Sequence, residues 1–178
     1  MCGILGVYYK NVVGVNVNIN DVLQRLKKLQ HRGKDSYGIS YHYNGEHLSF
    51  KKKGTIQPLF EGIKGIQNYI AHVRYSTSGE KNEKEIQPLV YKTIRIVHNG
   101  NIPILKGHDT TGLFNMIKNE KINTIEDKLI KLMDTIVASY CLIIMIDNIL
   151  YIIRDRYGIR PLCFGEKDDQ IIISSESC

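Results

Sequence analysis

The stretch Met1-Cys2-Gly3-Ile4-Leu5-Gly6-Val7-Tyr8-Tyr9 places a thiol directly before an apolar and aromatic run. Residues 3–9 are typical of a strand that is buried on at least one face. If Met1 is removed, Cys2 carries its own α-amine, whose pKa of roughly 8 lets it act as a base near neutral pH. One residue would then supply both nucleophile and base, an arrangement known for N-terminal threonine and cysteine. The alternative is an incidental cysteine at a frayed chain end.

The length and composition favour a single globular domain. The chain has 178 residues, of which 43% are hydrophobic and 24% charged, values that are ordinary for a soluble protein with a substantial core. No apolar run is long enough to span a membrane and no basic region precedes the first one, so we expect no signal peptide and a cytoplasmic location. The net charge of +6 comes from scattered lysines and short runs such as Lys51-Lys52-Lys53. This distribution favours a solvated surface over a nucleic-acid or membrane partner.

The cysteines and histidines do not suggest a metal centre. The four cysteines are far apart and indicate neither a zinc site nor a disulfide framework; they are Cys2, Cys141, Cys163 and Cys178. Cys141 lies in the apolar run 141–146, where a small buried hydrophobic residue is the simplest interpretation. The six histidines show no metal-ligand spacing. We therefore expect no metal and no cofactor.

Apolar periodicity predicts many strands and three helices. Helices are expected at about 20–30, capped by Asn20, and at 111–119 and 124–136. Strands beyond the first are expected at 37–43, 46–53, 68–73, 89–92, 94–98, 139–146, 149–154 and 170–174. Asn44-Gly45 and Asp147-Asn148 predict the turns of two hairpins. Because strands and helices come in blocks without strict alternation, we expect an α+β layered fold.

Polar clusters stand beside the apolar segments at three places. They are Gln30-His31-Arg32-Gly33-Lys34-Asp35-Ser36, His72-Val73-Arg74-Tyr75-Ser76-Thr77-Ser78-Gly79 and His98-Asn99-Gly100-Asn101. An arginine at the end of a strand, such as Arg74, can bind a small carboxylate through two hydrogen bonds. An Asn-Gly pair can offer a side-chain amide and a backbone N–H to a developing oxyanion.

Each cluster also has a purely structural interpretation. Arg74 could form a surface ion pair, and residues 98–101 could be a plain turn. Arg32-Gly33 could stop a helix, and Asp109 could be a helix N-cap. Taken one at a time, the clusters leave these alternatives open.

Taken together with Cys2, the clusters resemble the class II glutamine amidotransferases, in which an N-terminal cysteine releases ammonia from glutamine. The matching stretches occur in that family's order across practically the whole chain; they are residues 2–6, 30–36, 72–79, 86–89, 98–101, 154–162 and 174–177. Residues 72–77, His-Val-Arg-Tyr-Ser-Thr, are most similar to the branch that contains the glutaminase domain of amidophosphoribosyltransferase, the first committed enzyme of purine synthesis. The aminosugar synthase branch prefers tryptophan at the position of Tyr75.

The resemblance implies a fold and a reaction. The fold is the four-layer αββα sandwich of the N-terminal nucleophile hydrolases, formed by a single glutaminase domain over residues 1–178. Cys2 would attack the side-chain amide of glutamine, and its α-amine would carry the thiol proton to the leaving ammonia. Asn99 and the N–H of Gly100 would form the oxyanion hole.

The resemblance also implies how glutamine is held. Arg74 would bind its α-carboxylate, Asp109 would bind its α-ammonium group, and Arg32 would help to organise the nucleophile. Thr77 and Gly33 complete the predicted substrate-binding set. Residues 74–85 would close over the substrate and exclude water. Residues 154–162 and 174–177 are expected to maintain turns and strand ends.

Three departures from the family pattern keep alternatives open. Purine-type members continue into a phosphoribosyltransferase domain, which we expect to be absent from this chain, so that an acceptor domain or subunit is supplied elsewhere. The segment between Asn99 and Asp109 is short, and Thr111 stands in place of a common glutamate. Retention of Met1 would block the α-amine. The alternatives are a non-catalytic glutamine-binding or regulatory remnant, and a glutaminase that serves another acceptor, such as a sugar phosphate.

Overall fold

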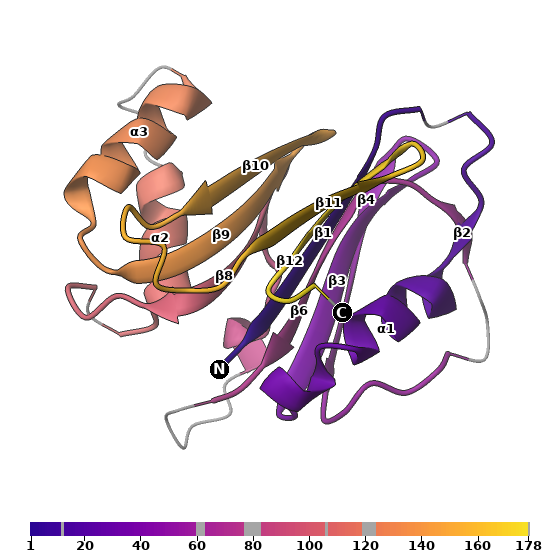
Figure 1. Ribbon diagram of the computed structural model, residues 1–178, viewed down its shortest axis with the longest axis horizontal. Helices are drawn as coiled ribbons and strands as arrows, with labels where there is room; N and C mark the ends of the chain where they lie inside the picture. Colours follow the sequence, from indigo (N-terminus) through magenta and orange to yellow (C-terminus); the bar gives the residue numbers. More distant parts are fainter. Residues whose placement is uncertain (12, 60–62, 77–82, 106, 119–123, 178) are drawn as a thin grey trace.

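A computed structural model of the protein describes residues 1–11, 13–59, 63–76, 83–105, 107–118 and 124–177. Two antiparallel sheets lie face to face, with helices on their outer faces (Figure 1). The larger sheet has the order β11-β12-β1-β6-β3-β4, formed by β1 Gly3–Tyr9, β3 Ser36–Tyr43, β4 Glu46–Lys53, β6 Tyr69–Arg74, β11 Cys163–Lys167 and β12 Gln170–Ser174. The smaller sheet has the order β10-β9-β8-β7, formed by β7 Leu89–Tyr91, β8 Ile94–Asn101, β9 Ser139–Ile146 and β10 Ile149–Arg154.

The remaining elements cover or flank these sheets. A short ribbon pairs β2 Val17–Asn18 with β5 Lys64–Ile66. The helices are α1 Ile19–Lys27, α2 Asp109–Ile117 and α3 Ile125–Thr135, and two 3₁₀ turns span Gln30–Arg32 and Glu83–Glu85. Helix α1 covers the larger sheet, whereas α2 and α3 cover the smaller one (Figure 1). Within the described residues, each helix is too short or too polar to cross a membrane.

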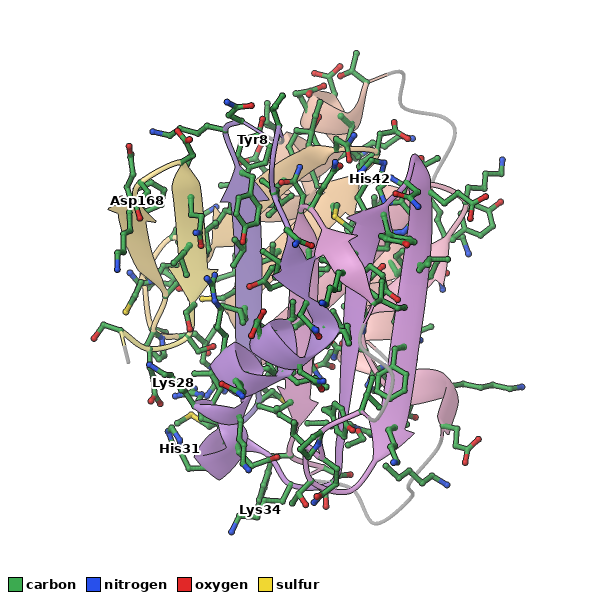
Figure 2. All side chains as sticks on the ribbon, turned by 90° about the vertical axis from the view of Figure 1, so that its right-hand side faces the viewer. Tyr8, Lys28, His31, Lys34, His42 and Asp168 are labelled. Atoms are coloured by element: carbon green, nitrogen blue, oxygen red, sulfur yellow. The ribbon has the colours of Figure 1, made fainter. Side chains whose placement is uncertain are left out.

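Strand β1 shows why the larger sheet is apolar on both faces. Successive side chains of a strand point to opposite faces. Ile4 packs against Val97 and Ile143 of the smaller sheet. Leu5 and Val7 point to the other face, where they join the core beneath α1. Figure 2 views this face and shows α1 lying across the strands. The predicted buried strand is therefore confirmed with its bounds, and it is buried on both faces.

Strand β9 sorts its side chains in the same way for the smaller sheet. Ile143 and Met145 face the larger sheet, whereas Leu142 and Ile144 pack in the core formed with α2 and α3. The chain therefore stacks one helix, two sheets and two further helices around three apolar layers. This arrangement is the α+β, αββα sandwich that the sequence resemblance implied.

Both predicted hairpins are present, and their turns have the expected backbone. Asn44 and Gly45 have positive φ angles of 49° and 81° between β3 and β4, as a type I′ turn requires. Asp147, between β9 and β10, has a φ of 49°. The strands on either side of each turn end within one residue of the predicted bounds.

Some local predictions were wrong. Helix α1 is capped by Asn18, not Asn20, because Asn18 Oδ1 accepts from the Asn20 N–H at 2.9 Å and Asp21 accepts from the Asn18 N–H at 3.1 Å. Residues 98–101 belong to β8 and do not form a turn after it. Strands β2, β5 and β11 had no counterpart among the predicted elements, because they are short or mainly polar.

Gly38 on β3 of the larger sheet lies directly against the backbone of Gln87. A Cβ atom built on Gly38 would lie well under 3.0 Å from the carbonyl oxygen of Gln87, a backbone atom that cannot rotate away. Gly165 on β11 is the matched position, since a Cβ there would meet nothing within 4 Å.

We expect Gly38→Ala to lower the free energy of unfolding by about 1–3 kcal/mol, as overpacking does elsewhere. Gly165→Ala should leave it unchanged or raise it slightly, because alanine restricts the unfolded chain. Urea unfolding of both variants measures the difference. Equal stability of the two variants would contradict the close approach at Gly38.

Candidate active site

The pairing of β1 with β6 positions the predicted nucleophile. Gly3 lies opposite Val73, so Cys2 lies beside Arg74 at the same end of the sheet. The thiol Sγ of Cys2 donates to the carbonyl oxygen of Tyr75 at 3.7 Å. Because side chains alternate along β1, Cys2 points to the same side as Ile4, toward the smaller sheet. The thiol therefore lies at the edge of the layer between the sheets.

Burial and nearby positive charges have opposite effects on the pKa of the Cys2 thiol. Burial raises the pKa of the Cys2 thiol, because the thiolate loses solvation. The hydrogen bond to Tyr75, the positive chain terminus, Arg74 and Arg32 each lower this pKa, but burial is the larger effect. At neutral pH the thiol consequently keeps its proton, and a nearby base is needed to make the thiolate.

A cavity of about 470 Å³ opens at this end of the molecule. Its lining brings together Cys2, Arg74, Gly100 and Asp109, which come from four separate segments of the sequence. Two sheets and the start of α2 thus meet at one cavity. Half of the eight predicted site residues line it directly.

Strand β8 brings Gly100 to the cavity, whereas the predicted site residue Asn99 beside it is not among the lining residues. Asn99 is only 2% exposed, and its side-chain Nδ2 has no hydrogen-bond partner among the described residues. The N–H groups of a strand point alternately to its two edges. The His98 N–H points away from β9, to the side chain of Gln87, and the Gly100 N–H shares that edge. Strand β7 pairs with β8 only as far as Ile96, so among the described residues no strand covers the Gly100 N–H.

Gly100 leaves no room for a side chain. A Cβ atom there would lie 2.5 Å from the Ser139 carbonyl oxygen, 2.6 Å from His98 Nε2 and 2.7 Å from the Tyr140 Cα. Two of these three neighbours are backbone atoms of β9, so they cannot move aside. The close packing explains the glycine and fixes the position of its N–H.

Arg74 and Asp109 both contribute to the lining of the cavity. An Nη atom of Arg74 contacts a carboxylate oxygen of Glu85 at 2.5 Å, and the Arg74 side chain is almost fully buried. Asp109 is the first residue of α2, and its carboxylate accepts from the Ile102 N–H at 2.8 Å. The N-cap of α2 is His108, so the alternative that made Asp109 an N-cap is wrong.

The other predicted substrate-binding residues lie outside the cavity wall. Arg32 is buried behind Cys2: its Nε donates to the Cys2 carbonyl oxygen at 2.9 Å, and its Nη1 contacts Glu176 at 2.5 Å. Gly33 packs against the backbone of Arg74, where a Cβ would clash, so it permits Arg74 to lie where it does. Thr77 lies outside the described residues, as do residues 77–82, half of the predicted closing segment 74–85.

Residues 154–162 and 174–177, which were predicted to maintain turns and strand ends, form hydrogen bonds to the backbone of neighbouring segments. The carboxylate of Asp155 accepts from the backbone N–H groups of Tyr140 and Tyr157 at 3.2 and 3.0 Å. Ser175 pairs with Ile4 through two bonds of 3.0 Å, one from backbone to side chain and one between backbones. These bonds join the C-terminal strand to the start of β1.

The cavity also contains polar residues to which sequence analysis gave no role. Glu85, Gln87, His108 and Thr110 all line it. Gln87 stood within a matching stretch, but its partners are distant in the sequence, so no local pattern indicated its contacts. Among the described residues, no group of three or more His, Cys, Asp or Glu side chains could hold a metal ion.

Comparison with known proteins agrees with this geometry. No protein-family model matches the chain. The amidophosphoribosyltransferase of Methanocaldococcus jannaschii is 33% identical over 205 aligned residues, which cover 100% of this chain and 42% of the relative. The chain therefore spans less than half the length of the curated relatives that it matches.

Solved structures give the same relationship. The glutamine phosphoribosylpyrophosphate amidotransferase from B. subtilis, complexed with ADP and GMP, superposes with a TM-score of 0.81 and 25% identity. A structure of the allosteric regulatory enzyme of purine biosynthesis superposes equally well, and both matches cover 99% of this chain and 42% of the other. Sequence, fold and site geometry together place the chain in the class II glutamine amidotransferase family, as a homologue of the glutaminase domain of amidophosphoribosyltransferase.

Proposed function

We propose that this chain is a glutaminase domain that hydrolyses the side-chain amide of glutamine to glutamate and ammonia through a thioester on Cys2. The observation that carries the proposal is the convergence of Cys2, Arg74, Gly100 and Asp109 on one cavity. These residues supply the four groups that bind and cleave glutamine. The thiol would attack the amide carbon, and the backbone N–H would bind the amide oxygen. The guanidinium group would bind the α-carboxylate, and the carboxylate would bind the α-ammonium group.

The reaction takes place in two steps. Cys2 Sγ attacks the amide carbon, and the carbonyl oxygen becomes an oxyanion that the Gly100 N–H and the Asn99 side-chain amide stabilise. The α-amine of Cys2 passes the thiol proton to the amide nitrogen, the C–N bond breaks, this nitrogen leaves as ammonia, and a thioester remains. Water attacks this thioester, releases glutamate and returns the proton to Cys2.

The base in this mechanism is the α-amine of Cys2, which exists only after Met1 has been removed. Burial raises the pKa of the thiol, so the site needs a base within reach of Sγ. The α-amine is attached to the same residue and meets this need. Met1 is largely exposed, with its Sδ 3.1 Å from Arg160, and so is accessible for removal.

Arg74 and Asp109 would recognise the amino-acid end of the substrate. The guanidinium plane of Arg74 can hold the α-carboxylate with two hydrogen bonds. One carboxylate oxygen of Asp109 is engaged by the Ile102 N–H, which orients the group toward the cavity. Glu85 contacts Arg74 here, so glutamine would compete with this carboxylate for the guanidinium.

We further propose that the ammonia goes to an acceptor domain, on a longer chain or on a partner subunit. The chain spans 42% of relatives named amidophosphoribosyltransferase, so a phosphoribosyl acceptor in purine biosynthesis fits this homology best. On this proposal residues 1–178 form one glutaminase domain, and the phosphoribosyltransferase activity resides elsewhere.

Cys2→Ala should abolish glutamine hydrolysis and covalent labelling by a glutamine-like diazoketone, because no nucleophile remains. Cys163→Ala is the matched control, since Cys163 is a second partly exposed free cysteine and lies outside the active-site cavity. Ammonia release and intact-protein mass measure both effects. Labelling that persists in Cys2→Ala would refute the thioester mechanism, and saturable glutamine binding without any labelling of the parent protein would favour a glutamine-binding remnant.

Asp109→Asn should raise KM for glutamine about tenfold to a hundredfold with a smaller change in kcat, because a lost charge-assisted bond costs about 1.5–3 kcal/mol. Asp134→Asn, on the exposed face of α3, is the control for loss of one negative charge. Steady-state kinetics separate the two parameters. A change confined to kcat would place Asp109 outside the binding of the α-ammonium group.

Alkylation of Cys2 by iodoacetamide, in protein that retains Met1, should increase with pH and have its midpoint above that of free cysteine. The thiolate is the reacting form, and burial raises the pKa of Cys2, so less thiolate is present at any given pH. Arg74→Gln should move the midpoint higher still, because the Arg74 charge lowers this pKa. Mass spectrometry of the Cys2 peptide gives the rates; a midpoint below that of free cysteine would contradict the dominance of burial.

A further inference from the structure

Gln87 joins three layers of the fold at the edge of the cavity. Its side-chain Oε1 accepts from the His98 N–H of β8 at 2.6 Å, and its Nε2 donates to the Thr110 hydroxyl of α2 at 2.9 Å. Its backbone carbonyl packs against Gly38 of the larger sheet, where no Cβ would fit. Gln87 is also 97% buried and lines the cavity. One side chain thus fixes the distance between β8 and α2, which carry Gly100 and Asp109.

The side-chain amide of Gln87 continues the hydrogen bonding of β8 beyond the end of β7. Strand β7 pairs with β8 through Leu89 and Ile96, and the next N–H on that edge of β8 belongs to His98. Gln87 Oε1 accepts this N–H as the carbonyl of a longer β7 would. The N–H after it on the same edge belongs to Gly100 and is left for the cavity. Gln87 therefore determines where pairing stops and where the free N–H begins.

The same contacts accommodate one particular tautomer of His98. A backbone N–H can only donate, so the Gln87 atom that meets it is the oxygen and the atom that meets Thr110 is the NH₂ group. The Thr110 hydroxyl accepts from Gln87 and lies 3.1 Å from His98 Nδ1, to which it can donate its own hydrogen. A neutral imidazole whose Nδ1 accepts carries its proton on Nε2.

The Nε2 atom of His98 lies over Gly100. His98 is 96% buried, and Nε2 has no hydrogen-bond partner among the described residues. Nε2 is 2.6 Å from the position that a Cβ of Gly100 would occupy, so the ring rests on the Gly100 Cα. Burial, with smaller contributions from His108 and Arg160, lowers the pKa of His98 to about 3, so the ring is neutral at physiological pH.

We propose that Gln87, Thr110 and His98 are positioning residues, which hold the Gly100 N–H in its direction toward the cavity through a neutral His98 with its proton on Nε2. This inference rests on the glutaminase function proposed above. On this inference the three residues help to stabilise the oxyanion and do not contribute to substrate binding. Their loss should consequently lower kcat and leave KM for glutamine nearly unchanged.

Two variants remove the hydrogen bonds and keep the volume. We expect Gln87→Met and Thr110→Val each to lower kcat by about tenfold or more, short of the 10²–10³ that a lost oxyanion donor costs, with KM within about threefold of the parent value. Thr110→Ser keeps the hydroxyl and should restore most of the rate lost in Thr110→Val. Equal kcat values for Thr110→Val and the parent protein would overturn the proposal.

Gln67 provides the matched control. Its Oε1 lies 2.6 Å from His42 Nδ1, so it bonds to the ring of a histidine that does not line the cavity, and Figure 2 shows His42 at the opposite end of the larger sheet from His31. Gln67→Met should leave kcat unchanged. An equal loss of kcat in Gln67→Met would show that any lost Gln–His bond slows the enzyme through stability, and the proposal would fail.

The His98 tautomer tests the proposal independently of activity. Nitrogen-15 NMR of histidine-labelled protein at pH 7, with the His98 signals identified from a His98→Gln sample, should show a proton on Nε2 and a bare Nδ1. A proton on Nδ1 or a doubly protonated ring would overturn the proposal. If the parent protein hydrolyses no glutamine but shows the Nε2–H tautomer, the proposed function fails while the hydrogen-bond arrangement stands.

Discussion

The register between β1 and β6 is the constraint on which the rest of the site depends. It places Gly3 opposite Val73, and thereby puts Cys2 beside Arg74 and the Tyr75 carbonyl. A shift of one residue would turn every side chain of β1 to the other face of the sheet. Ile4 would then face α1, and Cys2 would leave the layer between the sheets. The apolar core that stabilises β1 therefore also determines where the thiol points.

The site combines a partly buried thiol with groups that backbone packing holds in place. Burial disfavours the thiolate of Cys2, which suits a nucleophile that shares a residue with its base. Backbone contacts fix the surrounding groups: Gly33 touches the Arg74 backbone, and Gly100 touches β9. Rigid placement of donors before the reaction is the property that makes an oxyanion site effective. The interior of the sandwich thus provides the preorganisation that the chemistry needs.

Local sequence patterns predicted most of the fold, and distant contacts account for what they missed. The strand over residues 3–9 and both hairpins follow from side-chain alternation and turn residues. The cap of α1 was misplaced because Asn18 and Asn20 are equally suitable by type, and only Asp21 decides between them. The resemblance gathered Cys2, Arg74, Gly100 and Asp109 into one site. It included Gln87 in a matching stretch but gave it no role, because its partners His98 and Thr110 are 11 and 23 residues away.

The position of the basic run Lys51-Lys52-Lys53 on β4 indicates a role for these charges. This strand is the outer edge of the larger sheet and, within the described part of the chain, pairs with β3 alone, so its other side presents N–H and C=O groups that no described strand pairs with. All three lysines are exposed. Like charges on an open edge repel the same edge of another molecule and hinder the addition of a further strand. Part of the positive charge therefore protects the protein against edge-to-edge aggregation.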